Sequence, residues 1–264
     1  MLVMGILNVT PDSFSDGGAY LDPQTAIEHG LRMVEEGADL IDVGGASTRP
    51  GSIGVAPEEE LRRVLPVIER LVASACVPIS IDTSQALVAA QAVKAGAAIV
   101  NDVTALRGDA AMADVVARSR ASVILMHMQG TPQTMQAHPR YRHVVHDVAR
   151  FLCARARVAE AAGIARERIL LDPGLGFGKT AAHNLTLLHA LDHLTAFGYP
   201  VIVGPSRKSF IGATLDAPIE DRLAGTLACV AWAQRCGVCI VRVHDVKSTV
   251  HLLRMLEAIE RATS

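Results

Sequence analysis

The chain has 264 residues, 50% of them hydrophobic, and a formal net charge of -2 at pH 7. This length allows one large domain or two ordinary ones, and the near-neutral charge without a long basic run argues against nucleic acid or an anionic membrane as partner. No apolar stretch approaches the roughly 18–20 residues of a membrane helix, and the odd number of cysteines, 5, is typical of reduced thiols in a cytoplasm.

The first expected element is a short apolar run at residues 2–7, which predicts a strand buried on both faces that ends at Asn8. About a dozen turn-forming residues follow before helical spacing begins near Pro23. Strand-to-helix loops usually have about 2–6 residues, and much longer ones tend to be functional or disordered. We therefore expect an amide at the end of the first strand and a mobile loop beyond it.

Strand patterns and helical spacings then alternate along the rest of the chain. The expected strands cover residues 2–7, 40–43, 79–81, 99–100, 122–126, 169–171, 201–203 and 238–241. The expected helices cover residues 23–36, 57–73, 85–95, 109–118, 143–162, 184–194, 221–235 and 248–261. Pro66 should kink or split the second helix, because proline lacks a backbone N–H.

This alternation, with no linker or composition break, favours one α/β domain over residues 1–264: a (β/α)8 TIM barrel with parallel strands. A doubly wound open sheet is the alternative, but the sequence has no fingerprint for its switch point. In a barrel, the strands' C-terminal ends meet at one mouth, where catalytic groups gather. The residues expected there are Asn8, Asp42, Asp82, Asn101, His127, Asp172, Ser206 and Arg242.

Polar residues after three of the strands indicate an anionic, phosphate-bearing substrate. Arginine offers a bidentate fork to phosphate oxygens, although Arg207 could equally form a surface ion pair. The residues concerned are Thr48 and Arg49 after the second strand, Ser206, Arg207 and Lys208 after the seventh, and Arg242 and His244 at the eighth.

A second group of residues suits a flat, hydrogen-bonding heterocycle. Asp172 and Asn101 are short polar groups at strand ends, and a carboxylate accepts two parallel hydrogen bonds from an amidine-like ring edge. Asp82 could instead be a structural acceptor. Asn8 is a neutral oxygen ligand suited to Mg²⁺, which keeps most of its waters and takes substrate phosphate oxygens. Phenylalanines in three of the loops, Phe14, Phe177 and Phe210, favour stacking on a flat ligand.

Three further patterns do not support a function. Residues 174–180 resemble a phosphate loop but have three residues, not four, between the first glycine and the Gly-Lys pair. Cys236 and Cys239 have redox or zinc spacing without a second pair, so we expect buried structural thiols. His189 and His193 are four residues apart but lack the glutamate of a zinc protease, so we expect a solvated helix face.

The motifs as a group resemble those of the dihydropteroate synthase family. Residues 4–18, MGILNVTPDSFSDGG, are similar to its first signature, and residues 42–51, DVGGASTRPG, to its second, except that Ala46 stands where the family usually has Glu. The resemblance covers nearly the whole chain in the right order. It continues through residues 81–83, 100–103, 125–130, 171–174, 176–179, 206–209 and 242–245.

This resemblance implies a TIM barrel that condenses 6-hydroxymethyl-7,8-dihydropterin diphosphate with 4-aminobenzoate by a dissociative reaction, in which diphosphate leaves before the amine attacks. Mg²⁺ would bind Asn8. The implied diphosphate ligands are Asn8, Thr48, Arg49, Arg242 and His244, and the implied pterin ligands are Asp82, Asn101, Asp172 and Lys208. The implied 4-aminobenzoate residues are Thr48, Pro50, Phe177, Ser206 and Lys208. The residues with expected catalytic roles are Asp82, Lys208, Arg242 and His244.

Two other functions remain open at this stage. One is a methyltetrahydrofolate-dependent methyltransferase on the same pterin-binding barrel, although such proteins lack the long first signature. The other is a non-catalytic pterin-binding protein. The expected helix at residues 221–235 is apolar on most faces, as helices covered on more than one side are. A C2 homodimer, which the resemblance also implies, would cover it.

Overall fold

The computed structural model describes residues 1–10, 23–48, 51–52 and 54–262; the expected mobile loop at residues 11–22 lies outside this range. Within it, eight parallel strands pair in the order β6-β5-β4-β3-β2-β1-β8-β7. A parallel bridge between Leu171 and Val201 joins the two ends of this order, so the sheet closes on itself. The barrel prediction is confirmed, and the open sheet is excluded. The strands are β1 (Leu2–Asn8), β2 (Leu40–Gly44), β3 (Ile79–Asp82), β4 (Ile99–Asp102), β5 (Ser122–Met126), β6 (Ile169–Asp172), β7 (Ile202–Val203) and β8 (Ile240–Val243).

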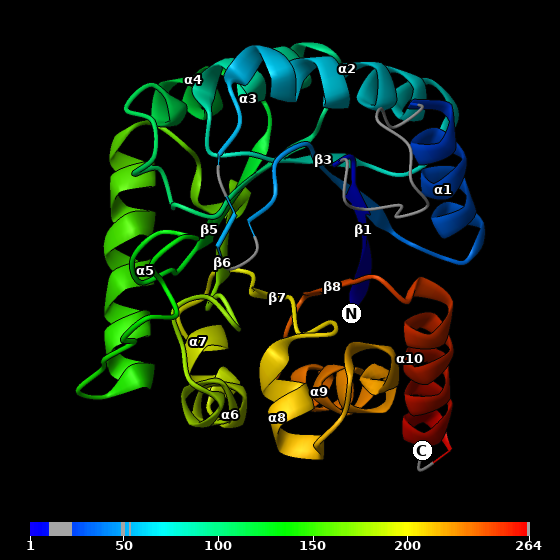
Figure 1. Ribbon diagram of the computed structural model, residues 1–264, viewed down its shortest axis with the longest axis vertical. Helices are drawn as coiled ribbons and strands as arrows, with labels where there is room; N and C mark the ends of the chain where they lie inside the picture. Colours follow the sequence, from blue (N-terminus) through cyan, green and yellow to red (C-terminus); the bar gives the residue numbers. More distant parts are fainter. Residues whose placement is uncertain (11–22, 49–50, 53, 263–264) are drawn as a thin grey trace.

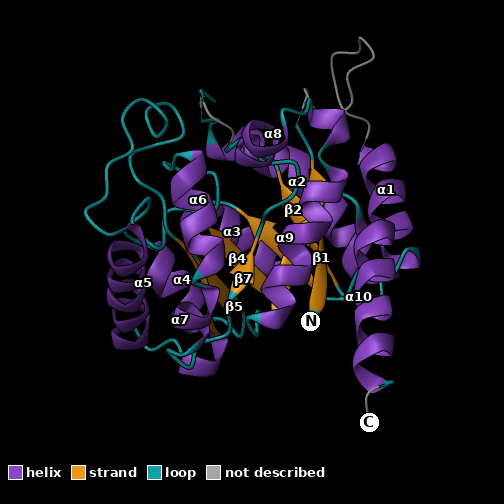
Figure 2. Ribbon diagram, turned by 90° about the horizontal axis from the view of Figure 1, so that it is seen from below, coloured by secondary structure: helices purple, strands orange, loops and turns teal. Residues whose placement is uncertain are grey.

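Helices surround these strands on the outside of the barrel (Figure 1; Figure 2). They are α1 (Pro23–Glu35), α2 (Pro57–Ser74), α3 (Ala86–Lys94), α4 (Met112–Arg118), α5 (Val144–Ala161), α6 (Ala181–His189), α7 (Leu191–Thr195), α8 (Ser209–Leu215), α9 (Leu223–Arg235) and α10 (Val246–Arg261). Short 3-10 turns precede β6 and α9, η2 (Arg166–Arg168) and η3 (Ile219–Asp221). In the described part of the chain, no helix combines the length and apolar character needed to span a membrane.

The structure corrects three local expectations. The helix α2 continues through Pro66 without a break, because the burial of its apolar side against the core outweighs one missing hydrogen bond. The single helix expected at residues 184–194 is two helices, α6 and α7, which meet at Ala190. Phe210 lies in α8 and is 3% exposed, so it packs in the core and is not a loop residue available for stacking.

The barrel interior is filled by one separate apolar cluster, while a larger cluster lies between the strands and the helices. Seven of the eight strands contribute one side chain to the interior cluster, and the matching position of β3 is Ser80, paired in register with Ile99. The interior residues are Met4, Leu40, Ile99, Ile124, Leu170, Ile202 and Ile240. The centre of the barrel is therefore a packed core and not a pore.

The period of the strands places a polar layer directly above this apolar cluster. Residues i and i+2 of a strand point to the same face, so each interior apolar residue puts the residue two positions later at the mouth. The pairs are Leu40 and Asp42, Ile99 and Asn101, Leu170 and Asp172, and Ile240 and Arg242. The strand register thus gathers two carboxylates, an amide and a guanidinium at the C-terminal end of the barrel.

Candidate active site

An ion-pair network joins four strands at the barrel mouth. Arg242 Nε on β8 donates to Asp42 Oδ2 on β2 at 2.6 Å, and its Nη2 donates to Asp82 Oδ2 on β3 at 2.9 Å. Asn101 Nδ2 on β4 donates to the same Asp42 oxygen at 3.0 Å. The structure therefore brings together four residues that are up to 200 positions apart in the chain.

Burial is the largest influence on the pKa of Asp82 in this network. It raises the pKa of Asp82 to about 7; Arg242 opposes this shift, and Asp42 adds to it. Asp42 Oδ1 and Asp82 Oδ1 are buried with no hydrogen-bond partner among the described residues. Buried polar atoms are nearly always hydrogen-bonded, so two acceptor atoms at the mouth suit a ligand that supplies N–H donors.

Asp172 ends β6 and is only 7% exposed. Its Oδ1 accepts a hydrogen bond from the Gly174 amide at 2.7 Å. Burial raises its pKa, while the Gly174 N–H, Lys208 and Lys179 act in the opposite direction. Gly174 has a φ of 66°, a left-handed conformation that glycine adopts without strain. The turn after β6 thus fixes the carboxylate from the backbone.

An aromatic and apolar wall with a cation lies above the strands. The Lys208 Nζ lies 4.0 Å from the ring centroid of the partly buried Phe177, a distance typical of a cation–π contact. The Phe177 ring packs against a separate cluster at the ends of β4 and β5, formed by Val103, Met126, Met128 and Met135. This wall offers an aromatic ring with a positive charge over its face.

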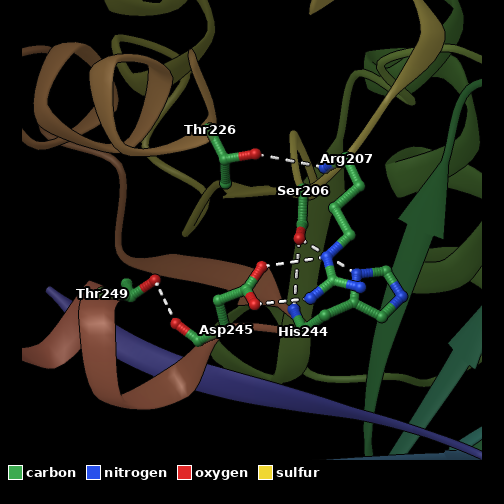
Figure 3. A network of polar contacts seen from close by, with 6 residues as sticks. All are labelled: Ser206, Arg207, Thr226, His244, Asp245 and Thr249. Atoms are coloured by element: carbon green, nitrogen blue, oxygen red, sulfur yellow. Dashed lines mark hydrogen bonds and ion pairs between the residues drawn. The ribbon is translucent and has the colours of Figure 1, made fainter. Parts of the chain in front are cut away.

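A second polar network lies between β7 and β8 (Figure 3). The His244 backbone N–H donates to Ser206 Oγ at 3.2 Å, so the Ser206 hydroxyl is left to donate to His244 Nδ1 at 3.0 Å. Burial lowers the pKa of His244 to about 3, helped by Arg242 and Arg207. A neutral imidazole that accepts at Nδ1 carries its hydrogen on Nε2. His244 therefore presents a neutral N–H donor held in place by Ser206.

Arg207 is occupied in an ion pair. Its Nε and Nη2 donate to the two oxygens of Asp245 at 3.0 and 2.6 Å, and its backbone N–H donates to Thr226 Oγ1 at 3.1 Å (Figure 3). Asp245 is fixed in turn, because its backbone carbonyl accepts from Thr249 Oγ1 at 2.9 Å. Of the two interpretations that the sequence left open for Arg207, the ion pair is the one observed.

The remaining predicted residues lie near β1 and β2 or outside the described residues. Asn8 ends β1 opposite Gly44, and a Cβ built on Gly44 would lie 3.8 Å from Asn8 Oδ1 and 3.7 Å from Asp82 Oδ2. Thr48 is partly buried in the loop after β2. Arg49 and Pro50 are outside the described residues, as is Phe14. Asn8 is thus next to the ion-pair network.

The donor set does not form a complete metal site. Among the described residues, no group of three or more His, Cys, Asp or Glu side chains has the arrangement of a metal centre. Asn8 offers one neutral oxygen beside Asp82. This fits Mg²⁺ held mainly by water and by substrate phosphate oxygens, as this ion commonly is, and it does not fit a metal that the protein binds alone.

The sequence assigned no individual role to two residues that lie at the centre of the observed contacts. Asp42 links Arg242 to Asn101, and its signal in the sequence is a carboxylate inside the apolar run at residues 40–43. Lys179 is 3% exposed and lies beside His127. It has no comparable signal, because a lysine in a glycine-rich loop is usually solvated.

Of the predictions for the histidine pair and the cysteine pair, one is confirmed and one is wrong. His189 and His193 are both exposed, as a solvated face requires. Cys239 is exposed and Cys236 only partly buried, so the prediction of buried thiols is wrong. The pair lies at the surface turn between α9 and β8, which the spacing of the sequence did not reveal.

The mouth therefore combines three binding surfaces. Carboxylates and an amide with open acceptor atoms suit a planar ring with N–H donors, and Phe177 with Lys208 suits an aromatic anion. Arg242 and His244 supply donors for a second anionic group on the β8 side.

Comparisons with known proteins agree with this chemistry. The family of pterin binding enzymes matches residues 4–244. The dihydropteroate synthase of Escherichia coli K12 is 48% identical over 256 residues, which cover 97% of this chain and 90% of the relative. That of Bacillus subtilis strain 168 is 45% identical over 258 residues, covering 98% of this chain and 88% of the relative.

Solved structures are about as similar to this chain as these relatives are. The dihydropteroate synthase of Xanthomonas albilineans with 4-aminobenzoic acid has a TM-score of 0.93 and 50% identity, covering 98% of this chain and 93% of the other. The same enzyme in complex with 7,8-dihydropteroate has a TM-score of 0.89 and 48% identity, with coverage of 98% and 93%.

Proposed function

The chain belongs to the dihydropteroate synthase family of pterin-binding enzymes, and we propose that its barrel mouth acts by letting diphosphate leave before the second substrate attacks. Its activity is that of a transferase of folate biosynthesis: it condenses 6-hydroxymethyl-7,8-dihydropterin diphosphate with 4-aminobenzoate to give 7,8-dihydropteroate and diphosphate. The observation that best supports this proposal is the convergence of four polar residues at one barrel mouth: Asp42, Asp82, Asn101 and Arg242. The chain is also similar to these synthases over nearly its whole length. No observation favours the methyltransferase or the non-catalytic alternative.

The pterin would bind at the polar layer above the apolar interior. Asp172, held by the Gly174 amide, would accept hydrogen bonds from the amidine-like edge of the ring, and Asn101 would serve as donor and acceptor. Asp82 Oδ1 is buried without a hydrogen-bond partner among the described residues and would be a further acceptor. Lys208 would contact the ring from the loop after β7.

The 4-aminobenzoate would lie against the Phe177 wall, nearer to the rim. Its benzene ring suits the Phe177 wall. Its carboxylate suits the charge of Lys208, whose Nζ lies 4.0 Å from the centroid of the Phe177 ring. Ser206 follows β7 beside Lys208. Thr48 and Pro50 from the loop after β2 would complete this site by the family resemblance.

The diphosphate would occupy the β8 side of the mouth. Arg242 and the Nε2–H of His244 are the donors that support this assignment. Thr48 and Arg49 would add contacts from the loop after β2. Asn8 would hold Mg²⁺ together with diphosphate oxygens, and the ion would supply Lewis-acid stabilisation of the charge on the leaving group.

The reaction needs no protein nucleophile. The bond between the pterin methylene carbon and the diphosphate oxygen breaks, its electron pair leaves with diphosphate, and a cation delocalised over the pterin remains. Arg242 and His244 would stabilise the departing charge, as donors placed in advance do. The carboxylates of Asp82 and Asp172 would stabilise the cation. The amine of 4-aminobenzoate then attacks the methylene carbon and loses a proton.

We also propose a homodimer and a cytoplasmic location. The helices α8, α9 and α10 pack side by side (Figure 1) and expose large apolar side chains. These are Leu215 at 50%, Trp232 at 41%, Met255 at 61% and Ile259 at 52% exposed. A C2 partner would cover such a surface; a monomer by light scattering at micromolar concentration would contradict this.

The cytoplasmic location is supported by the odd number of cysteines.

The function is tested by measuring diphosphate release from the purified chain. We expect release that depends on both the pterin diphosphate and 4-aminobenzoate, with a matching amount of dihydropteroate. Chelation of Mg²⁺ should lower the rate, and added Mg²⁺ should restore it. An absence of both dihydropteroate and diphosphate when both substrates are present would contradict the assignment.

A further inference from the structure

Lys179 is a buried cation to which the reaction described above gives no role. It lies in the loop between β6 and α6 (residues 173–180, loop 6) and is only 3% exposed. Its Nζ lies 2.9 Å from the Gly174 carbonyl oxygen, 3.0 Å from that of Phe177 and 3.3 Å from that of His127. It also lies 3.0 Å from His127 Nδ1. A lysine is almost never buried this completely without partners of this kind.

The surroundings of Lys179 Nζ match an ammonium ion. Burial lowers the pKa of His127 to about 3, so the imidazole is neutral and its Nδ1 accepts while Nε2 carries the hydrogen. All four atoms around the nitrogen are then acceptors, and an ammonium group has only donors. Burial also lowers the pKa of Lys179 to about 7, against the attraction of Asp172, but the acceptor-only environment favours the charged form.

Loop 6 depends on these contacts for its shape. Its glycines at 174, 176 and 178 have φ values of 66°, 82° and 63°. Glycine has more backbone freedom than any other residue, so other contacts must fix this conformation. The Gly174 and Phe177 carbonyls face Lys179. The Gly176 carbonyl accepts from Gln136 Nε2 at 2.6 Å, and that of Gly178 from the Tyr141 hydroxyl at 2.7 Å. Four carbonyls of the loop thus bind either an internal cation or side chains of the loop after β5.

The same loop carries the parts of the site that touch both substrates in the proposed function. The Gly174 amide holds the Asp172 carboxylate, and the Phe177 ring lies under Lys208. The two carbonyls of loop 6 that Lys179 binds belong to Gly174 and Phe177 themselves. A change at Lys179 would therefore be transmitted to Asp172 through the Gly174 backbone and its amide hydrogen bond, and to the Phe177 ring through the Phe177 backbone.

We propose that Lys179 is a positioning residue: its ammonium group, oriented by His127, serves as an internal cation around which loop 6 folds, and so sets the place of the Phe177 wall of the 4-aminobenzoate site. The inference rests on the proposed roles of Phe177 and Asp172. It gives Lys179 no contact with the substrates. The effect should be confined to the β6 side of the mouth, because Arg242 and His244 are held by Asp42, Asp82 and Ser206.

The test is Lys179→Met, which keeps an unbranched side chain, one atom shorter, and removes the charge and the donors. We expect the KM for 4-aminobenzoate to rise at least 10-fold. The Kd for inorganic diphosphate, measured by titration calorimetry, should stay within twofold of wild type. A folded variant whose KM for 4-aminobenzoate changes by less than twofold would overturn the proposal, as would equal losses for both ligands.

The matched control is Arg168→Met at the opposite end of the barrel. Arg168 Nη1 donates to the carbonyls of Ser119 and Ala121, both at 2.9 Å, so this variant also removes a cation that binds backbone carbonyls. It should lower the thermal midpoint and leave both constants within twofold. A similar rise in its KM for 4-aminobenzoate would show that loss of stability alone explains the Lys179 result.

Lys179→Ala serves where the methionine variant does not fold. Propylammonium replaces the atoms that alanine lacks, so its addition should lower the KM for 4-aminobenzoate at least fivefold, and propanol should not. Equal effects of the two additives, or none from either, would overturn the proposal. Wild-type protein is assayed alongside: an inactive wild type contradicts the proposed function, whereas an active wild type with unchanged variants contradicts only the role of Lys179.

Discussion

The shared carboxylate of Asp42 gives the sharpest prediction about the site. Asp42 is fully buried and its Oδ2 accepts from both Arg242 Nε and Asn101 Nδ2. The change Asp42→Asn keeps the shape of the side chain and removes its charge. Because Arg242 and Asn101 then lose their common charged anchor, both the fold and the anion-binding side of the mouth should weaken.

The magnitude follows from the surroundings of Arg242. Removing one partner of a buried ion pair typically costs about 3–5 kcal/mol. The Arg242 side chain is 20% exposed and keeps Asp82 at 2.9 Å, and the asparagine oxygen can still accept one hydrogen bond. We therefore expect a loss of about 2–3 kcal/mol in the free energy of unfolding. The value of kcat/KM should fall about 10- to 100-fold, equal to about 1.4–2.7 kcal/mol in the barrier.

The assays are urea unfolding and steady-state kinetics corrected for the folded fraction. The control is Asp39→Asn: Asp39 is exposed, and its Oδ2 accepts the Val3 N–H at 2.8 Å at the start of β1. It should cost less than about 1 kcal/mol in stability and leave kcat/KM unchanged. An Asp42→Asn protein with the stability and the kcat/KM of wild type would refute the account of the network.

Three other changes test separate parts of the site. Arg242→Ala should lower kcat/KM by about 30- to 1,000-fold, the 2–4 kcal/mol that one donor placed in advance contributes; wild-type turnover would refute its role. Ser206→Ala removes the hydroxyl that orients His244 and should cost about 1–2 kcal/mol in kcat/KM, seen as a higher Kd for diphosphate; an unchanged Kd would contradict that orientation. Burial raises the pKa of Asp82 from 3.8 to about 7, so its contribution to stability is present below about pH 4 and is lost as the pH rises through 7. The free energy of unfolding of Asp82→Asn minus that of wild type should therefore increase between pH 4 and 7 and level off above 8, and a flat difference would show that Asp82 is not perturbed.

The barrel could be predicted because its signals are local. Each strand is a short apolar run, and each run ends in a polar residue such as Asp82 or Asp172, so the order of elements and the composition of the mouth follow from the sequence. The strand register then decides which polar residues share a face, and the interval of two between Leu40 and Asp42 is already visible.

The deviations come from tertiary contacts that a local pattern does not contain. The burial of α2 carries the helix through Pro66, and the break at Ala190 has no proline or glycine to mark it. The helix α8 begins one residue after Lys208 in a stretch that reads as a loop. For α2, packing against neighbours outweighs intrinsic preference.

The site residues divide in the same way. Arg242 and Asp172 are predictable from their place at strand ends. The link through Asp42 is not, because it joins residues 200 positions apart. The role of Lys179 depends on three backbone carbonyls, and backbone atoms leave no trace in the identity of the residues that carry them.

A crystal structure of the chain with the pterin diphosphate bound would test the shared mouth most directly. We expect the ring within hydrogen-bonding distance of Asp172 and Asn101, at the bottom of the mouth, and the diphosphate on Arg242 and the Nε2 of His244. A ligand bound elsewhere, or one that places its diphosphate away from β8, would contradict the assignment of the pterin and diphosphate sites.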